Sequence, residues 1–226
     1  MFKHLKSGTV LVIFLLAGCN VASNEMQALN EDFEKDYQQL QVENLEALPN
    51  IEVIDGITYV DDILIVNKEI SLPEDYSPGL QPEVIEAYQQ MFQDGAAEGL
   101  DFVLVSDFRT YDYQAQLYQN YIARDGQEAA DQYSAKPGHS EHQTGLAIDV
   151  GSSDSLTNLK WEFGDTPEFQ WMKDVAHEYG FIIRYLEGKE DITGYMYEPW
   201  HLRYVGEEAP AIYESGLTLE EYLGID

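Results

Sequence analysis

The pattern of apolar and polar residues predicts a folded domain that begins near Pro49. Residues 51–70, IEVIDGITYVDDILIVNKEI, carry clustered β-branched residues on both sides of Asp55-Gly56, a dipeptide typical of a tight hairpin turn. Residues 81–99, QPEVIEAYQQMFQDGAAEG, have the spacing of an amphipathic helix, with Pro82 in its first turn and a glycine after its end. We therefore expect a hairpin and then a helix at the start of this domain.

The remainder of the chain alternates helical and extended patterns. DFVLVS predicts a buried strand, and the helical pattern of residues 111–132 is interrupted at Gly126. PEFQWMKDVAHEYG predicts a helix closed by Gly180. GLAIDVG, FIIRY and WHLRYV are strand candidates. Several helices with few strands, and no internal repeat, indicate an α+β fold.

The first residues carry the pattern of a targeting segment. Lys3 and Lys6 precede TVLVIFLLAG, a run too short to span a bilayer but typical of a secretory signal. The sequence LLAGC resembles a bacterial lipobox, which implies cleavage before Cys19 and lipidation of its thiol. An ordinary secretory signal with an incidental cysteine is the alternative. We interpret residues 1–18 as a lipoprotein signal peptide, residues 19–48 as an acidic tether and residues 49–226 as the folded domain.

Composition narrows the class of protein. Twelve Lys and Arg residues stand against 42 Asp and Glu, which gives a formal charge of -30. This argues against nucleic-acid binding, which requires a basic surface to displace counterions from phosphates. The single cysteine, Cys19, excludes an intramolecular disulfide.

The segment GHSEHQTGLAID concentrates chemically active residues. It holds two of the chain's five histidines, and six residues separate His142 from Asp149. YEPWHLRY adds Glu198 and His201. Two histidines and one carboxylate with a free fourth position are typical of a catalytic zinc ion. Taken alone, this spacing more often reflects a hydrogen-bonded structural His–Asp pair, and the chain has no HExxH motif.

These motifs resemble a known family. SEHQTGLAID is similar to the SxHxxGxAxD motif of VanY-type D-alanyl-D-alanine carboxypeptidases, and EPWH to their ExxH motif. ILIVNKEISLPEDYSPGL and VSDFRTYDYQAQLY resemble the family's entry segment and its SxYRxxxxQ region. The resemblance covers residues 51–205. It implies a small antiparallel sheet flanked by helices, as in zinc folds of the lysostaphin, D-Ala-D-Ala peptidase and hedgehog type.

The resemblance also implies roles for individual residues. His142, Asp149 and His201 would bind Zn²⁺, and Glu198 would be the catalytic base. Arg109 would polarise the scissile carbonyl and stabilise the oxyanion.

Two further residues, Gln114 and Ser140, would help to hold the terminal D-alanine of the substrate. Asp107 departs from the family pattern, which often has a small residue there, and an acid so close to Arg109 puts carboxylate recognition in doubt. Phe108 in place of tyrosine is a milder departure. By their positions, Trp200 and Tyr133 are candidates for the cleft wall.

The sequence therefore predicts a lipid-anchored, extracytoplasmic zinc D-alanyl-D-alanine carboxypeptidase that removes the terminal D-alanine from peptidoglycan stem peptides, with a monomer as the favoured state. An L,D-carboxypeptidase that acts on tetrapeptides is the nearest alternative, because the same motifs build both zinc sites. An endopeptidase of the same fold is a further variant. A non-catalytic module that binds wall peptides, and a structural lipoprotein with an incidental histidine cluster, are the alternatives outside enzymes.

Overall fold

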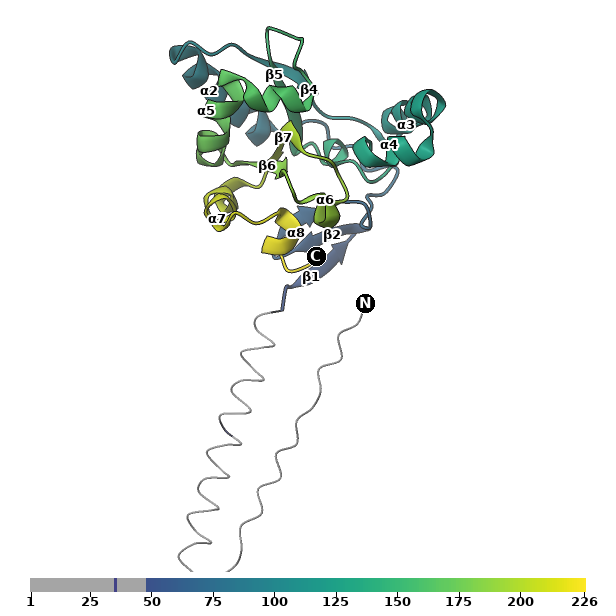
Figure 1. The fold of residues 1–226 in the computed structure, drawn as a ribbon. Helices are drawn as coiled ribbons and strands as arrows, with labels where there is room; N and C mark the ends of the chain where they lie inside the picture. Colours follow the sequence, from purple (N-terminus) through teal and green to yellow (C-terminus); the bar gives the residue numbers. More distant parts are fainter. Residues whose placement is uncertain (1–34, 36–47) are drawn as a thin grey trace, which may run out of the picture. The chain divides into compact units, whose positions relative to one another are not determined.

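The computed structural model describes Lys35 and residues 48–226. The contacts within the chain divide the chain into two units, with the boundary between Leu48 and Pro49. The unit Pro49–Asp226 combines two antiparallel sheets with surrounding helices (Figure 1). The predicted signal peptide, Cys19 and all of the predicted tether except Lys35 and Leu48 lie outside the described residues. Among those described, no helix has the length and apolar character needed to cross a membrane.

The first sheet is a three-stranded meander. Its strands are β1 (Ile51–Ile54), β2 (Ile57–Val60) and β3 (Ile63–Ile65), all antiparallel. Asp55 and Gly56 join β1 to β2 with φ values of 52° and 80°. Positive φ at both central residues is the geometry of a type I′ turn, which matches the twist of the strands it connects. The predicted hairpin is confirmed.

The helices near the second sheet also follow the sequence pattern. The helix predicted over residues 81–99 is α2 (Pro82–Ala97). The next helical segment consists of α3 (Tyr111–Asp125) and α4 (Gln127–Tyr133), separated at Gly126 with φ of 84°. Both predictions are confirmed. DFVLVS forms β4 (Phe102–Ser106), an edge strand of the second sheet, and its residues are half-buried where the sequence predicts a buried strand.

The second sheet has the order β4-β5-β7-β6, with every neighbouring pair antiparallel. Its other strands are β5 (Ala147–Ser152), β6 (Phe181–Tyr185) and β7 (Glu198–Tyr204). The helix predicted before Gly180 is α5 (Pro167–Val175), whose last turn continues as a 3₁₀ segment, Ala176–Tyr179. The α+β class and the small antiparallel sheet are confirmed.

Two hydrophobic clusters hold this sheet. The larger one joins α2 and α5 to the central strands, with Met91, Met172, Ile148 and Leu202 fully buried. The smaller one joins the first sheet and β6 to α7 (Ala209–Ser215) and α8 (Leu219–Tyr222). A short helix, α6 (Glu190–Thr193), precedes β7 (Figure 1). Strands β5 and β7 are therefore fixed at the centre of the sheet, where rigid backbone can position side chains accurately.

Candidate active site and metal centre

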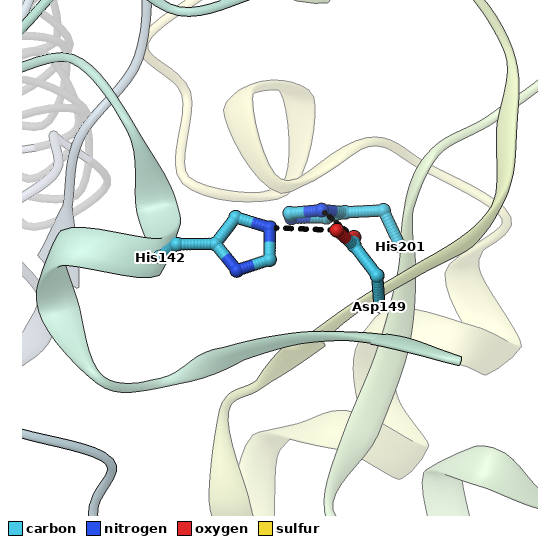
Figure 2. Close-up of side chains that lie close together, drawn as sticks. All are labelled: His142, Asp149 and His201. Atoms are coloured by element: carbon cyan, nitrogen blue, oxygen red, sulfur yellow. Dashed lines mark hydrogen bonds and ion pairs between the residues drawn. The ribbon is translucent and has the colours of Figure 1, made fainter. Parts of the chain in front are cut away.

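Three sequence-predicted residues meet at the two central strands. The register of β5 and β7 places Asp149 directly opposite His201. His142 comes from a 3₁₀ turn, Glu141–Thr144, which ends at Gly145 in the left-handed conformation before β5 begins. Figure 2 shows the imidazoles of His142 and His201 pointing toward the Asp149 carboxylate. One ligand atom from each residue lies within 4.8 Å of the others, and all three residues are buried.

The hydrogen bonds of His142 indicate a cation site. Its Nδ1 donates to the backbone carbonyl of Asp107 over 2.7 Å, so the neutral ring has a lone pair on Nε2. Burial, together with the charge of Arg109, lowers the pKa of His142 to about 4 and keeps the ring neutral. Nε2 is buried without a hydrogen-bond partner and lies 3.2 Å from the Asp149 Oδ2. Two facing electron-pair donors fit a bound metal ion.

His201 lies between two carboxylates. Its Nε2 lies 3.1 Å from Oε2 of Glu141, and its Nδ1 lies 3.0 Å from Oδ1 of Asp149. Burial would raise the pKa of Asp149, but His142 and His201 outweigh burial and hold it well below its usual range. Asp149 is therefore ionised at neutral pH. His142 Nε2, the Asp149 carboxylate and His201 Nδ1 form a set that suits Zn²⁺ and leaves room for a fourth ligand.

Glu198 lies at the start of β7, beside this cluster. Its Oε2 is 4.0 Å from His201 Nδ1, and the residue is only 7% exposed. Burial raises the pKa of Glu198 to about 8, and nearby Asp149 adds to the effect while His201 opposes it. A carboxyl group with a pKa in this range can both accept and release a proton near neutral pH.

Arg109 supplies positive charge on another side of the cluster. Its Nη2 lies 3.9 Å from Oδ2 of Asp149, and its Nη1 donates to Oε1 of Gln114 over 3.1 Å. The Asp107 side chain is exposed, and Asp107 meets the site through the carbonyl that binds His142. Gln114 is 1% exposed, and its amide donates to the Ala135 carbonyl. Gln114 is thus hydrogen-bonded to Arg109 and to the Ala135 backbone, and the predicted contact of Gln114 with substrate stays a prediction.

The three candidate metal ligands, Glu198 and Arg109 border one cavity of about 560 Å³. Ser140 lies on its wall, as does Trp200 on β7, and Tyr133 and the 59% exposed Trp161 line it as well. The cavity is lined by the residues of the candidate metal cluster and its neighbours: Arg109, Ser140, Glu141, His142, Asp149, Tyr185, Tyr195, Glu198, Trp200 and His201. The structure therefore brings together all the sequence-predicted site residues of the domain except Gln114, which is hydrogen-bonded to Arg109.

Comparison with known proteins identifies the family. The model of the family described as VanY, D-alanyl-D-alanine carboxypeptidase, matches residues 77–207. The chain belongs to the VanY family. YodJ of Bacillus subtilis (strain 168) is 37% identical over 224 residues, which span 88% of this chain and 79% of that protein.

Solved structures of VanY relatives share the fold. The L,D-carboxypeptidase DacB from Streptococcus pneumonia is 43% identical, with a TM-score of 0.72 over 79% of this chain and 97% of that chain. The vancomycin resistance D,D-pentapeptidase VanY, solved in complex with Zn(II), is 32% identical, with a TM-score of 0.61 over 70% and 97% of the two chains.

The VanY motifs predicted the candidate metal ligands but not the buried charged residues that surround them. Glu141 lies within the SxHxxGxAxD motif at a variable position, and we did not predict a role for it. Arg184 and Arg203 read as ordinary polar positions of their strands, yet both are 1% exposed and bind Glu141. Glu220 lies beyond the VanY match and binds Arg184. The alternation of β7 could have indicated that Arg203 shares a face with His201, but not which groups the two arginines bind.

Proposed function

We propose that the protein is a zinc-dependent carboxypeptidase that removes a C-terminal D-alanine from peptidoglycan stem peptides. The observation that carries this proposal is the convergence of His142, Asp149 and His201 next to buried Glu198 and Arg109 in one cavity. The family and the names of its members support the same reaction class. A non-catalytic module would not need a buried carboxylate beside the metal ligands.

The residues of the site suit hydrolysis of a peptide bond. Zn²⁺ held by the three ligands would lower the pKa of a bound water to about 7 and polarise a carbonyl group. Glu198 is placed to accept the proton of the attacking water and to pass it to the leaving amine. Arg109, fixed by Gln114, presents a positive charge toward the oxygen that becomes negative in the transition state.

Two substrate specificities fit this site, and the L,D form is our first candidate. The chain is 42–43% identical to the L,D-carboxypeptidases LdcB and DacB, with TM-scores of 0.71–0.72. Its identity to the D,D-pentapeptidase VanY of the VanB-type cassette is 32%, with a TM-score of 0.61. We therefore propose that tetrapeptide stems are preferred. The D,D reaction on pentapeptides is the second candidate, favoured by the description of the matching family and by a D-alanyl-D-alanine carboxypeptidase of Enterococcus faecium, 36% identical.

Release of D-alanine from synthetic stem peptides tests this proposal. The Zn²⁺-loaded chain should release D-alanine from a tetrapeptide faster than from the matching pentapeptide. Faster release from the pentapeptide would assign the D,D reaction instead. Release from neither peptide, by protein that has bound Zn²⁺, would refute the carboxypeptidase proposal and favour a binding module.

We also propose that Cys19 carries a lipid that anchors the enzyme on the outer face of the bacterial membrane, where its substrates lie. The LLAGC sequence supports this proposal. Labelling cells with a radioactive fatty acid should mark the protein, and Cys19→Ala should abolish the label. Label that persists in Cys19→Ala would contradict lipidation at this residue.

A further inference from the structure

A buried network of charged residues lies directly behind the candidate metal ligand His201. Its members are Glu141, Arg184, Arg203 and Glu220, each 2% exposed or less. Two carboxylates balance two guanidinium groups in this network. Buried charges of this kind persist only where each has partners, because removal from water is highly unfavourable.

Glu141 is the member that contacts His201. Its Oε1 accepts hydrogen bonds from Arg184 Nε at 2.7 Å and Arg203 Nη1 at 2.9 Å. Its Oε2 faces His201 Nε2 at 3.1 Å. The Glu141 carboxylate is thus held between two guanidinium groups and the His201 ring. A carboxylate oxygen in this position accepts a hydrogen bond from Nε2, the imidazole nitrogen farther from Asp149.

We infer that Glu141 is a positioning residue for the metal centre, which holds the proton of His201 on Nε2 and so presents Nδ1 to the cation. This inference rests on the metal site of the proposed function. An imidazole that binds a metal through one nitrogen is oriented by the hydrogen bond at the other, and loss of such a partner weakens metal binding about 10–100-fold. His142 is held in the same way by the Asp107 carbonyl, but there the partner is backbone.

The C-terminal helix α8 extends this support beyond the VanY match. Glu220 accepts hydrogen bonds from Arg184 Nη1 at 2.8 Å and Nη2 at 2.5 Å, so the guanidinium is held on two edges. Thr218 begins α8 with a capping box that fixes the first turn around Glu220. Arg184 thereby links α8 to Glu141, and Glu141 to His201. The segment after residue 207 is thus part of the support of the metal centre.

Zn²⁺ affinity of the full chain, measured by competition with a chromophoric chelator, tests the inference. Glu141→Gln keeps the shape but has one acceptor oxygen for three donors, so affinity should fall about 10–100-fold. Glu220→Gln should weaken binding less, and Glu214→Gln, an exposed change on α7, should not alter it. Circular dichroism and thermal unfolding of the metal-free proteins provide the control for folding. Wild-type affinity in a folded Glu141→Gln variant would overturn the inference.

A measurement on the wild-type protein covers the case in which Glu141→Gln does not fold. In the Zn²⁺-loaded chain, ¹⁵N NMR of the His201 ring should show the proton on Nε2 and the metal on Nδ1. The reverse arrangement would overturn the inference. Failure of the proposed function would appear differently, as tight Zn²⁺ binding and the expected ring proton without release of D-alanine.

Discussion

Gly145→Ala perturbs the turn that joins His142 to the strand carrying Asp149. Gly145 has φ of +72°, and a Cβ there would overlap the carbonyl oxygen of Gly79. The left-handed conformation costs an L-residue about 1–2 kcal/mol, and overpacking typically adds about 1–3 kcal/mol. The combined loss of about 2–5 kcal/mol is a large part of the roughly 5–15 kcal/mol that stabilises a typical domain.

Gly99→Ala is the matched control, because Gly99 has φ of +84° and a Cβ at this position would meet nothing within 4 Å. It should lose only the conformational part, about 1–2 kcal/mol. We would measure the free energy of unfolding of both variants in denaturant, with metal removed so that ligand binding does not contribute. Equal losses in the two variants would refute the argument from close packing against Gly79.

Three further predictions concern the site and the core. Arg109→Gln should reduce the rate of D-alanine release about 10²–10³-fold with Zn²⁺ content unchanged, and loss of the metal would show that Arg109 acts on the ligands instead. Phe163→Ala, at a fully buried position, should lower the free energy of unfolding by about 3–5 kcal/mol, and a loss under about 1 kcal/mol would contradict the packing described. Burial lowers the pKa of Lys68 from 10.5 to about 8. Between these two pH values the unfolded chain binds more protons at Lys68 than the folded chain does, so this residue makes the free energy of unfolding rise with pH. Lys68→Met should remove that rise. If the free energy of unfolding of Lys68→Met varies with pH as in the wild type, the rise does not come from Lys68.

Much of the domain could be predicted from the sequence because local patterns decide it. The Asp55-Gly56 turn, the helix after Pro82 and the break at Gly126 each depend on residues close in sequence. The strand with Asp149 was predicted, but its pairing with the strand carrying His201 is a long-range contact. The resemblance to VanY motifs predicted that Asp149 and His201 lie close together, whereas their spacing in the sequence did not decide this.

The support of the site could not be predicted in the same way. Glu141 and Glu220 are separated by 79 positions in the chain. A glutamate in a very acidic sequence is also expected to be exposed to solvent. Their burial depends on Arg184, which reaches both. Gln114, a motif residue expected at the substrate, is hydrogen-bonded to Arg109, a contact that the motif did not indicate.

We propose that this VanY-family protein hydrolyses peptides with a metal ion and Glu198. The most direct test compares D-alanine release by wild type and Glu198→Gln, with bound Zn²⁺ determined for each sample. Chelation should abolish release and Zn²⁺ should restore it, whereas Glu198→Gln should retain Zn²⁺ and lose about 10²–10⁴-fold in rate. Release that survives both chelation and Glu198→Gln would contradict the account.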